Sequence, residues 1–338
     1  MEERKNLNSF KESTNIGILT IMLTNKCQMK CPYCAVDRKY HDMPEHIMKK
    51  SIDLLLTSPL KDAQLQFFGG EPLLRWDLIK KGINYSQKMS RKKQKNIRYF
   101  LTTNGLLLDE LKISYLKQYP ITVMFSLDGS SETQIKNRPL IKNSKYPIEL
   151  LIKNLQSLIK HKIDYFVNLT FSPKNIKDLE KNIHYLINIG AKNILLSYTI
   201  GSYWPEKIIK SYLKLLKKFI KIQNLNLRNS TESSEPILGS PQILIDSSGK
   251  IYLGCAAVLE KTFPELNKSF YFNELIKVKE ILALKRTKKD QVALLKKLSK
   301  KFNPKLQRMI LNNLRFGELL NDFFKKECPV NKTNSVTS

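Results

Sequence analysis

The sequence predicts an α/β fold in which strand–helix units repeat around a parallel sheet. Two observations support this prediction. Between residue 16 and about residue 222, short β-rich runs alternate with amphipathic stretches. No long insertion interrupts the alternation. The expected strands are 17–24, 63–68, 97–103, 121–127, 164–171 and 192–199. Six such units predict a partial or complete barrel, or an open doubly wound sheet, with the site at the carboxyl ends of the strands.

A helix is expected after each of these strands, from the 3.6-residue spacing of apolar positions. The first begins with Pro44 in its first turn and places Ile47, Ser51, Ile52 and Leu55 on one face. The six expected helices lie near 44–57, 76–89, 107–118, 148–161, 175–189 and 206–222.

The regular alternation ends at a polar stretch, residues 224–236, which is typical of a linker. Residues 242–253 form two β-rich runs around a Ser-Ser-Gly turn and predict a hairpin. From about 273 to 327 the chain is rich in Lys and Leu and is expected to be helical. We therefore expect two domains, 1–225 and 226–338, the second a small α+β region.

Composition places the protein among globular proteins of a reducing compartment. Of 338 residues 42% are hydrophobic, and no apolar run approaches the ~20 residues of a membrane span. The polar N-terminus does not resemble a signal peptide. Five cysteines in so long a chain do not predict a disulfide framework. A cytoplasmic protein with thiols available as metal ligands, and no membrane partner, is expected.

The formal net charge of +28 is large. It suggests an anionic partner such as a nucleic acid or an acidic peptide. Many of the lysines, however, occur in pairs on expected solvent faces, such as Lys217–Lys218, as a coding bias alone could produce. Charge indicates solubility and non-specific association more than mechanism, so both interpretations stay open.

A group of three cysteines, Cys27, Cys31 and Cys34, directly follows the first expected strand. Thiolates are the ligands of iron–sulfur clusters, which normally take four, so three would leave one iron open to a small chelating cofactor. The alternative is a zinc site completed by a distant residue. His41 and His46 lie in or just before an expected helix and lack the paired spacing typical of zinc, which favours the cluster.

Distinctive motifs also follow the next three strands. Residues 67–74 read FFGGEPLL, in which Gly69 and Gly70 permit close backbone approach to a ligand and Glu71 offers a carboxylate to a cationic amine. TTNG (102–105) and SLDG (126–129) follow, and Arg138 comes soon after in Asn-Arg-Pro. Each alone is ordinary turn chemistry, but together they lie at the one edge where an α/β sheet builds its site.

The cysteine loop, with Tyr33 before its last cysteine, and the motifs that follow in order resemble the radical S-adenosylmethionine (SAM) superfamily. Within it, the chain resembles the SPASM-type subgroup that modifies peptides and proteins, which includes maturases of ribosomally made (RiPP) peptides and of sulfatases. The resemblance implies a partial (β/α)6 barrel and a [4Fe–4S] cluster on Cys27, Cys31 and Cys34.

The resemblance also implies a place for SAM. The Gly70–Glu71 segment would meet its amino group, Ser126 its ribose or carboxylate region, and Arg138 its carboxylate, for which a guanidinium is suited by bidentate pairing. Tyr33 would pack near the adenine, although an ordinary half-buried aromatic is an equal interpretation. The backbone at 195–197 is a further candidate for the adenine.

The implied activity is that of an enzyme. SAM chelates the open iron, one electron enters its sulfonium, and the resulting 5′-deoxyadenosyl radical removes hydrogen from a substrate. The implied partners are a peptide or protein, such as an acidic leader peptide, and an electron donor such as flavodoxin or ferredoxin. The alternatives are a nucleic acid or small metabolite as substrate, or a non-catalytic protein that binds a cluster or zinc.

The C-terminal region resembles a reduced SPASM domain. That domain carries auxiliary clusters on about seven cysteines, whereas only Cys255 and Cys328 lie outside the main loop here. Two thiolates fall short of four, so we expect no second cluster. Cys255, at the end of the expected hairpin, is a candidate cluster ligand, an inert thiol, or a catalytic hydrogen-atom donor.

Overall fold

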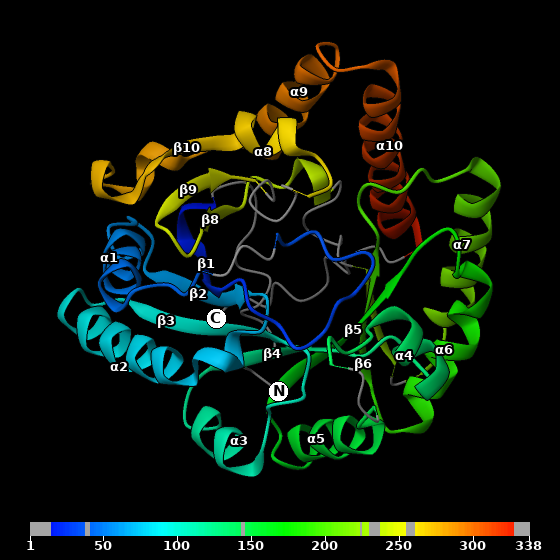
Figure 1. Cartoon of the computed structure of the whole chain (residues 1–338), viewed down its shortest axis with the longest axis horizontal. Coiled ribbons are helices and arrows are strands. Elements are labelled where there is room, and N and C mark those ends of the chain that lie inside the picture. Colours follow the sequence, from blue (N-terminus) through cyan, green and yellow to red (C-terminus); the bar gives the residue numbers. More distant parts are fainter. Residues whose placement is uncertain are drawn as a thin grey trace, which may run out of the picture.

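The structure is a computed structural model that describes residues 15–37, 41–142, 146–223, 225–229, 237–254 and 261–327. The strands of this part form one sheet in the order β10-β9-β8-β1-β2-β3-β4-β5-β6-β7. Figure 1 shows the sheet curved into an arc with helices around its outside. The α/β fold with a parallel strand–helix core is therefore confirmed.

The core of the sheet is six strands that lie side by side in chain order and run parallel. Their bounds confirm the six expected strands: β1 Ile18–Thr24, β2 Asp62–Gly69, β3 Asn96–Thr103, β4 Ile121–Ser126, β5 Asp164–Phe171 and β6 Asn193–Tyr198. Along β2 and β3 every second residue is buried, as the two-residue period of a strand requires. All carboxyl ends thus meet at one edge.

Helices follow these strands where the apolar spacing predicted them. They are α1 Glu45–Leu55, α2 Trp76–Lys92, α3 Glu110–Leu116, α5 Ile148–Lys160, α6 Leu179–Asn188 and α7 Glu206–Phe219. Their inner faces and the strands share a core with fully buried residues such as Phe67, Tyr99 and Tyr212. Burial of each such side chain stabilises the folded state by about 1.5–3 kcal/mol relative to leaving it exposed. Short 3₁₀ turns lie at Asn15–Gly17, Pro72–Arg75, Ile176–Asp178, Ile237–Gly239, Leu275–Lys277 and Ile281–Leu284.

One helix of the core was not expected. The short α4, Ser131–Asn137, follows the SLDG turn and begins at Ser130, whose hydroxyl accepts a hydrogen bond from the Thr133 backbone N–H. Its Gln134 Oε1 in turn accepts from the Asp128 backbone N–H at 2.8 Å. The helix therefore fixes the turn that precedes it.

The expected linker is wrong for residues 226–229. These residues form β7, Asn226–Asn229, which pairs parallel with β6 and places Leu227 opposite Ile194 in the core. A buried leucine with a strand partner outweighs the polar composition around it. Residues 230–236 lie outside the described part.

The expected hairpin is confirmed. It consists of β8, Ile243–Ile245, and β9, Lys250–Leu253, which pair antiparallel. β8 also pairs parallel with β1, and β10, Tyr271–Glu274, pairs antiparallel with β9, so the C-terminal region extends the core sheet.

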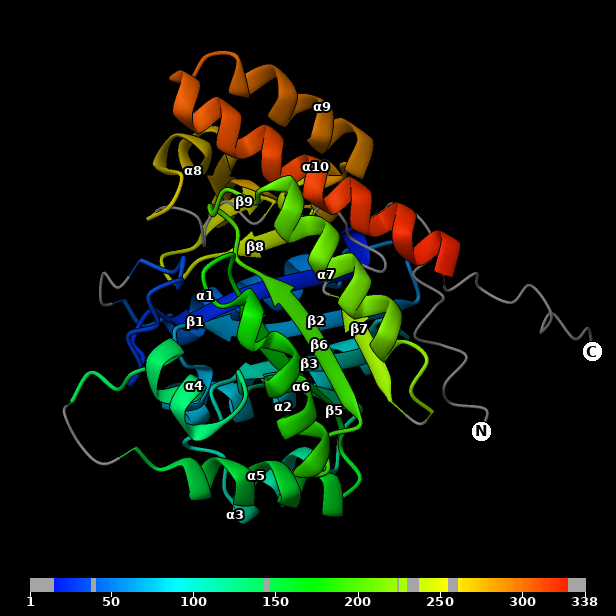
Figure 2. The same cartoon turned by 90° about the vertical axis from the view of Figure 1, so that its right-hand side faces the viewer.

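Three helices complete the C-terminal region: α8 Pro264–Phe270, α9 Lys288–Ser299 and α10 Pro304–Glu327. The expected helical segment is thus confirmed from 288 onward, but its start, at 273–274, belongs to β10. Figure 2 shows α10 running beside α7, with α9 stacked on it. None of the helices in the described ranges is long and apolar enough to cross a membrane.

Candidate active site

The loop after β1 carries three thiols. Cys27, Cys31 and Cys34 are free and half-buried. Burial raises the pKa of Cys27, and it raises the pKa of Cys31 to about 11. Such thiols ionise readily only beside positive charge such as a metal centre. A pocket of about 240 Å³ opens on the loop, lined by Lys30, Cys31, Pro32, Cys34, Val36, Asp37 and Lys261.

This cysteine loop is held by backbone pairing to a distant segment. Met29 forms an antiparallel bridge with Leu140. The Lys30 N–H donates to the Pro139 carbonyl at 2.8 Å, and the Ile141 N–H donates to the Gln28 carbonyl at 2.8 Å. The segment that follows Arg138 therefore pairs directly with the cysteine loop through backbone hydrogen bonds.

The two glycines at the end of β2 allow a close approach to the chain's own backbone. A Cβ atom on Gly69 would lie 2.2 Å from the Thr24 carbonyl oxygen, and one on Gly70 would lie 2.2 Å from the Lys26 carbonyl oxygen. The Gly70 N–H donates to Thr24 at 2.7 Å, and the Glu71 N–H donates to Lys26 at 2.8 Å. Any side chain here would push the turn away from the start of the cysteine loop.

Glu71 is a fully buried carboxyl group held by neutral donors. Its Oε1 accepts from the Leu73 N–H at 3.0 Å and the Thr103 hydroxyl at 2.8 Å, and its Oε2 accepts from the Asn104 N–H at 2.7 Å. In the part of the chain that the structure describes, no Lys, Arg or His pairs with it. Burial raises the pKa of Glu71 to about 7, even though these hydrogen bonds lower it.

Asp128 lies at the centre of a buried ion pair. Its Oδ1 accepts from Arg138 Nη2 at 2.8 Å and from the Thr170 N–H at 2.9 Å, and its Oδ2 accepts from the Tyr33 hydroxyl at 2.5 Å. The Arg138 guanidinium lies 5.5 Å from the centre of the Tyr33 ring. Burial opposes the charge of Arg138, but Asp128 outweighs it and the pKa of Arg138 is raised.

Two buried donors at this ion pair have no hydrogen-bond acceptor in the described structure, namely Arg138 Nε and Asn137 Nδ2. An unsatisfied buried donor costs about 1–3 kcal/mol, so such groups call for an explanation. A bound acceptor would satisfy them.

Ser126 and the backbone at 195–197 lie on opposite sides of the same residue. Ser126 ends β4 and is opposite Asn168 of β5, whose other neighbour is Leu195 of β6. The Ser197 hydroxyl donates to Asn168 Oδ1 at 2.6 Å. The candidate contacts to ribose and adenine thus lie on β4 and β6, with Asn168 of β5 between them. Cys255 and Cys328 lie outside the described residues.

Sequence reasoning missed two residues of this site. Asp128 and Asn104 lay inside the motifs SLDG and TTNG but were given no role. Asn104 Nδ2 is 3.7 Å from the Cys27 sulfur and 3.2 Å from Gln28 Oε1, so it joins the β3 turn to the cysteine loop. A polar residue before glycine is so common in turns that only its neighbours in space reveal such a role.

The donor set fits an iron–sulfur cluster. Three soft sulfur ligands come from one loop beside a pocket, and a cluster takes each thiolate on a different iron. No group of three His, Cys, Asp or Glu side chains that could hold a single metal ion is found among the described residues.

Sequence comparisons identify relatives of this chain. A family model described as the radical SAM superfamily matches residues 21–186. An uncharacterised protein of Methanocaldococcus jannaschii is 31% identical over 247 residues, which cover 70% of this chain and 83% of that protein. The radical SAM cyclopropyl synthase TigE of Paramaledivibacter caminithermalis is 27% identical over 60% of this chain, which spans only 46% of TigE. A GTP 3′,8-cyclase of Aquifex aeolicus is 27% identical over 62% of this chain and 66% of the cyclase.

Solved structures share the fold. The structure of anSMEcpe with bound AdoMet aligns with a TM-score of 0.72 and 18% identity over 92% of this chain and 96% of that one. Streptococcus suis SuiB bound to the precursor peptide SuiA aligns with a TM-score of 0.58 and 14% identity over 80% and 64%. The family is one of enzymes whose cofactors are a [4Fe–4S] cluster and SAM. From the family match and the 31% identical relative, this chain belongs to the radical SAM superfamily.

Proposed function

We propose that Cys27, Cys31 and Cys34 hold a [4Fe–4S] cluster and that the enzyme cleaves SAM there to act on a peptide or protein. The observation that carries this proposal is the buried carboxyl of Glu71, which has no cationic partner among the described residues and lies beside the loop of three thiols. When bound, the reduced cluster supplies one electron to the sulfonium of SAM, which yields methionine and a 5′-deoxyadenosyl radical.

Glu71 is suited to bind the ammonium group of SAM. A carboxylate has about four lone-pair sites, of which the protein fills two on Oε1 and one on Oε2. The remaining site on Oε2 can accept from an ammonium. The ammonium would also provide the positive counter-charge that the buried carboxylate lacks.

Arg138 is suited to the SAM carboxylate through its unpaired Nε, because Nη2 is already used by Asp128. The pairing with Asp128 leaves Arg138 less free charge than a lone guanidinium. We therefore assign it a weaker share of the binding than Glu71. Ser126 and Tyr33 complete the proposed contacts, to ribose and adenine.

The C-terminal region helps to exclude water from this site. Cys34, Ala35 and Val36 of the cysteine loop share a hydrophobic cluster with Ile310 and Leu314 of α10. Exclusion of water protects a reactive radical from side reactions. A core of 1–225 and a C-terminal region of 226–338 remain our proposed functional units, although one sheet joins them.

A peptide substrate is supported by the fold shared with SuiB, whose structure holds a precursor peptide. An electron donor such as flavodoxin or ferredoxin, and a cytoplasmic location, complete the proposal. Cys255 is proposed as the hydrogen-atom donor to the substrate radical, and the thiyl radical left on it would take one electron from the proposed electron donor and one proton. The similarity to a GTP cyclase makes a nucleotide the alternative substrate.

The test starts with anaerobically reconstituted protein reduced with dithionite. We expect about four irons per chain and formation of 5′-deoxyadenosine from SAM. Cys31→Ala should lose iron and product. Glu71→Gln should keep iron but bind SAM at least ~10-fold more weakly, because a charged partner of a buried pair is lost. Glu149→Gln, on the exposed surface of α5, is the control. Zinc without sulfide in the wild-type protein would refute the proposal.

The substrate is tested separately. Candidate precursor peptides encoded by neighbouring genes, and GTP, are each incubated with the active enzyme, and the products are examined by mass spectrometry. A mass change in a peptide supports the proposal, whereas a change in GTP alone would replace the peptide by a nucleotide.

A further inference from the structure

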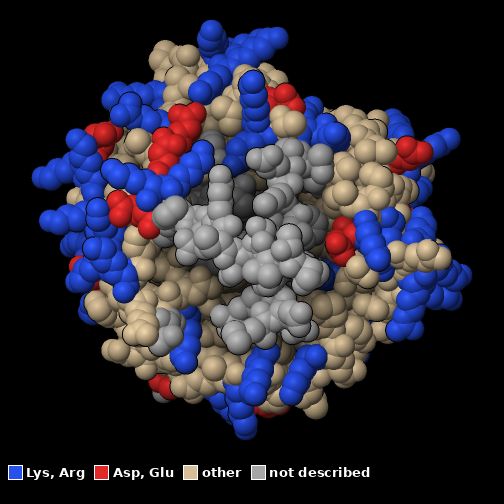
Figure 3. Space-filling view, turned by 180° about the vertical axis from the view of Figure 1, so that it is seen from behind, with Lys and Arg blue, Asp and Glu red and all other residues tan. Residues whose placement is uncertain are grey.

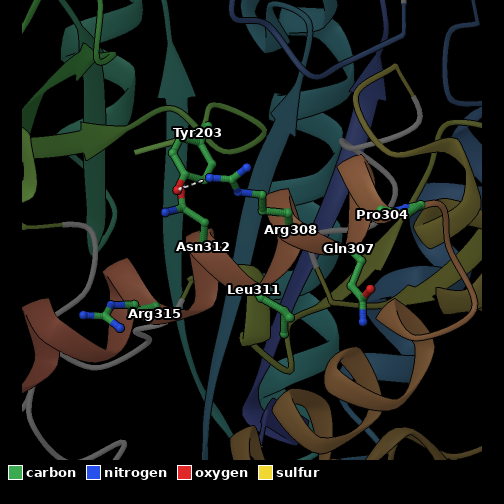
Figure 4. A pocket seen from close by; sticks show the side chains of 7 residues that line it. All are labelled: Tyr203, Pro304, Gln307, Arg308, Leu311, Asn312 and Arg315. Atoms are coloured by element: carbon green, nitrogen blue, oxygen red, sulfur yellow. Dashed lines mark hydrogen bonds between the residues drawn. The ribbon is translucent and has the colours of Figure 1, made fainter. Parts of the chain in front are cut away.

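A second pocket, of about 480 Å³, lies where α10 meets the loop after β6 (Figure 4). It is lined by Tyr203, Pro304, Gln307, Arg308, Leu311, Asn312 and Arg315. The lining combines two guanidinium groups with exposed apolar surface, since Tyr203 is 41% and Leu311 is 39% exposed. No carboxyl group is among the residues that line it.

The walls of this pocket are firmly built. Asn312 joins α10 to Trp204 twice, accepting from its N–H at 2.7 Å and donating to its carbonyl at 2.9 Å. Asn313 does the same with the Gly201 N–H and the Ser202 carbonyl, at 2.9 and 2.8 Å. Four side chain–backbone hydrogen bonds thus clamp the loop to the helix and fix the pocket's shape.

Arg308 is positioned before any ligand arrives. Its guanidinium lies 4.9 Å from the centre of the Tyr203 ring, and its Nη2 donates to the Tyr203 hydroxyl at 3.3 Å. Figure 4 shows this contact as a dashed line between Tyr203 of the loop and Arg308 of α10. The other donors of the guanidinium remain for a planar acceptor such as a carboxylate. Arg315 is less available, because Glu206 lies 3.4 Å from its Nη2.

The pocket lies at the carboxyl ends of the strands, the edge of the sheet that carries the candidate site. The loop at 199–205 follows β6, so it leaves the sheet at the same edge as the cysteine loop and the turns after β2, β3 and β4. The opposite face of α10, with Met309 and Ile310, packs into the hydrophobic cluster that contains Cys34 and Val36. The pocket therefore lies at the same edge of the sheet as the candidate site, but on the side of α10 that faces away from the cysteine loop.

We propose that this pocket, between the loop after β6 and α10, binds an acidic side chain of the peptide substrate next to an apolar one. This inference rests on the proposed function. Arg308 pairs with the carboxylate while Leu311 and Pro304 contact the neighbouring apolar residue. A base of a nucleic acid fits less well, because the guanidinium of Arg308 already covers the Tyr203 ring.

The general charge of the protein requires a control. Lys and Arg side chains lie all around the rim of the face in Figure 3, interspersed with Asp and Glu, so acidic ligands will bind weakly at many places. Arg91 and Lys92, exposed at the end of α2, carry the same charge as Arg308 and Arg315 but lie far from α10 (Figure 1).

The test measures binding by calorimetry to the reconstituted protein, with a short synthetic peptide of repeated Leu-Glu-Glu as probe. Its Leu-Gln-Gln counterpart and a short single-stranded RNA are the comparison ligands. We expect the Glu peptide to bind about ten-fold more weakly to the double variant Arg308→Ala/Arg315→Ala than to wild type, because the Arg308 ion pair and the neighbouring charge of Arg315 are both lost. The variant Arg91→Ala/Lys92→Ala should bind it like wild type.

Three outcomes would overturn the inference: equal binding of the Glu and Gln peptides, an equal loss in both double variants, or a greater loss for RNA than for peptide. The last would assign the pocket to a nucleic acid. Production of 5′-deoxyadenosine without peptide should be unchanged in Arg308→Ala/Arg315→Ala. If wild-type protein produced no 5′-deoxyadenosine, the proposed function would be refuted. The binding measurement would still decide whether the pocket prefers the acidic peptide.

Discussion

Glu71 and Asp128 are both fully buried carboxyl groups at carboxyl ends of the same sheet, yet their surroundings differ. Asp128 has a guanidinium partner, a phenol and a backbone N–H. Within the described ranges, Glu71 accepts from neutral donors only. The Asp128 carboxylate thus has its counter-charge within the protein, although Arg138 Nε lacks an acceptor, whereas Glu71 has no counter-charge among the described residues.

This difference separates two tasks within one site. The Asp128 group ties together β4, β5 and the cysteine loop, through Arg138, Thr170 and Tyr33, so its main effect is on structure. Glu71 joins the turns after β2 and β3 but keeps one acceptor site open. We therefore expect substitutions at Asp128 to affect folding most, and those at Glu71 to affect pH dependence and ligand binding.

The largest effect is expected from Asp128→Ala. It leaves the buried Arg138 guanidinium without its counter-charge, which should lower the free energy of unfolding by about 3–5 kcal/mol. Denaturant unfolding of the cluster-free protein measures this change.

The double variant Asp128→Ala/Arg138→Ala is its control. Removing both charges should destabilise by clearly less than the sum of the single variants, because neither charge is then buried alone. A loss below about 1 kcal/mol in Asp128→Ala would mean that the pair is not the structural joint we describe.

An intermediate effect is expected from pH. The pKa of Glu71 is raised from 4.5 to about 7, so the folded state binds a proton that the unfolded state releases. Its contribution to stability is therefore complete below pH 4.5 and is lost as pH rises to about 7, by roughly 3 kcal/mol.

Unfolding of the SAM-free, cluster-free protein across this pH range checks the sign. Glu71→Gln cannot titrate, so its stability should fall less than that of wild type between pH 4.5 and 7. Parallel curves for the two proteins would show that Glu71 is charged in the folded state throughout, and the contrast with Asp128 would disappear.

The smallest effect is expected from Tyr33→Phe. It removes one hydrogen bond to a buried carboxylate, worth about 1.5 kcal/mol, and frees one attachment of the cysteine loop. Reconstituted Tyr33→Phe should also lose iron to a chelator faster than wild type. Tyr85→Phe, which removes a similar bond to Asp53 on the surface between α1 and α2, should leave iron loss unchanged. Equal rates of iron loss in both variants would contradict the idea that the Tyr33–Asp128 hydrogen bond holds the cysteine loop.

Much of the fold was predictable because periodicity alone defines it. The six core strands and their helices were found from apolar spacing, and the hairpin from its turn. The four residues of β7 were misjudged because their sequence is polar and only pairing with β6 makes them a strand. Likewise, α4 is too short for its period to be visible, and its cap at Ser130 is one serine among many.

The site was predictable in its motifs but not in its pairings. The three cysteines, Glu71 and Arg138 stand out in the sequence, and the fold brings their loops to one edge. That Asp128 pairs with Arg138, and that Glu71 has no such partner, depends on how turns ten to thirty residues apart meet in space. The pocket at Arg308 needs a contact across about a hundred residues.

The bridge between Met29 and Leu140 has a consequence for biosynthesis. The cysteine loop is made early, but its pairing partner leaves the ribosome more than a hundred residues later. Until then the loop cannot take its final shape, and its thiols are open to oxidants. We therefore expect the proposed cluster to be inserted only after the β4 and α4 segment has been synthesised.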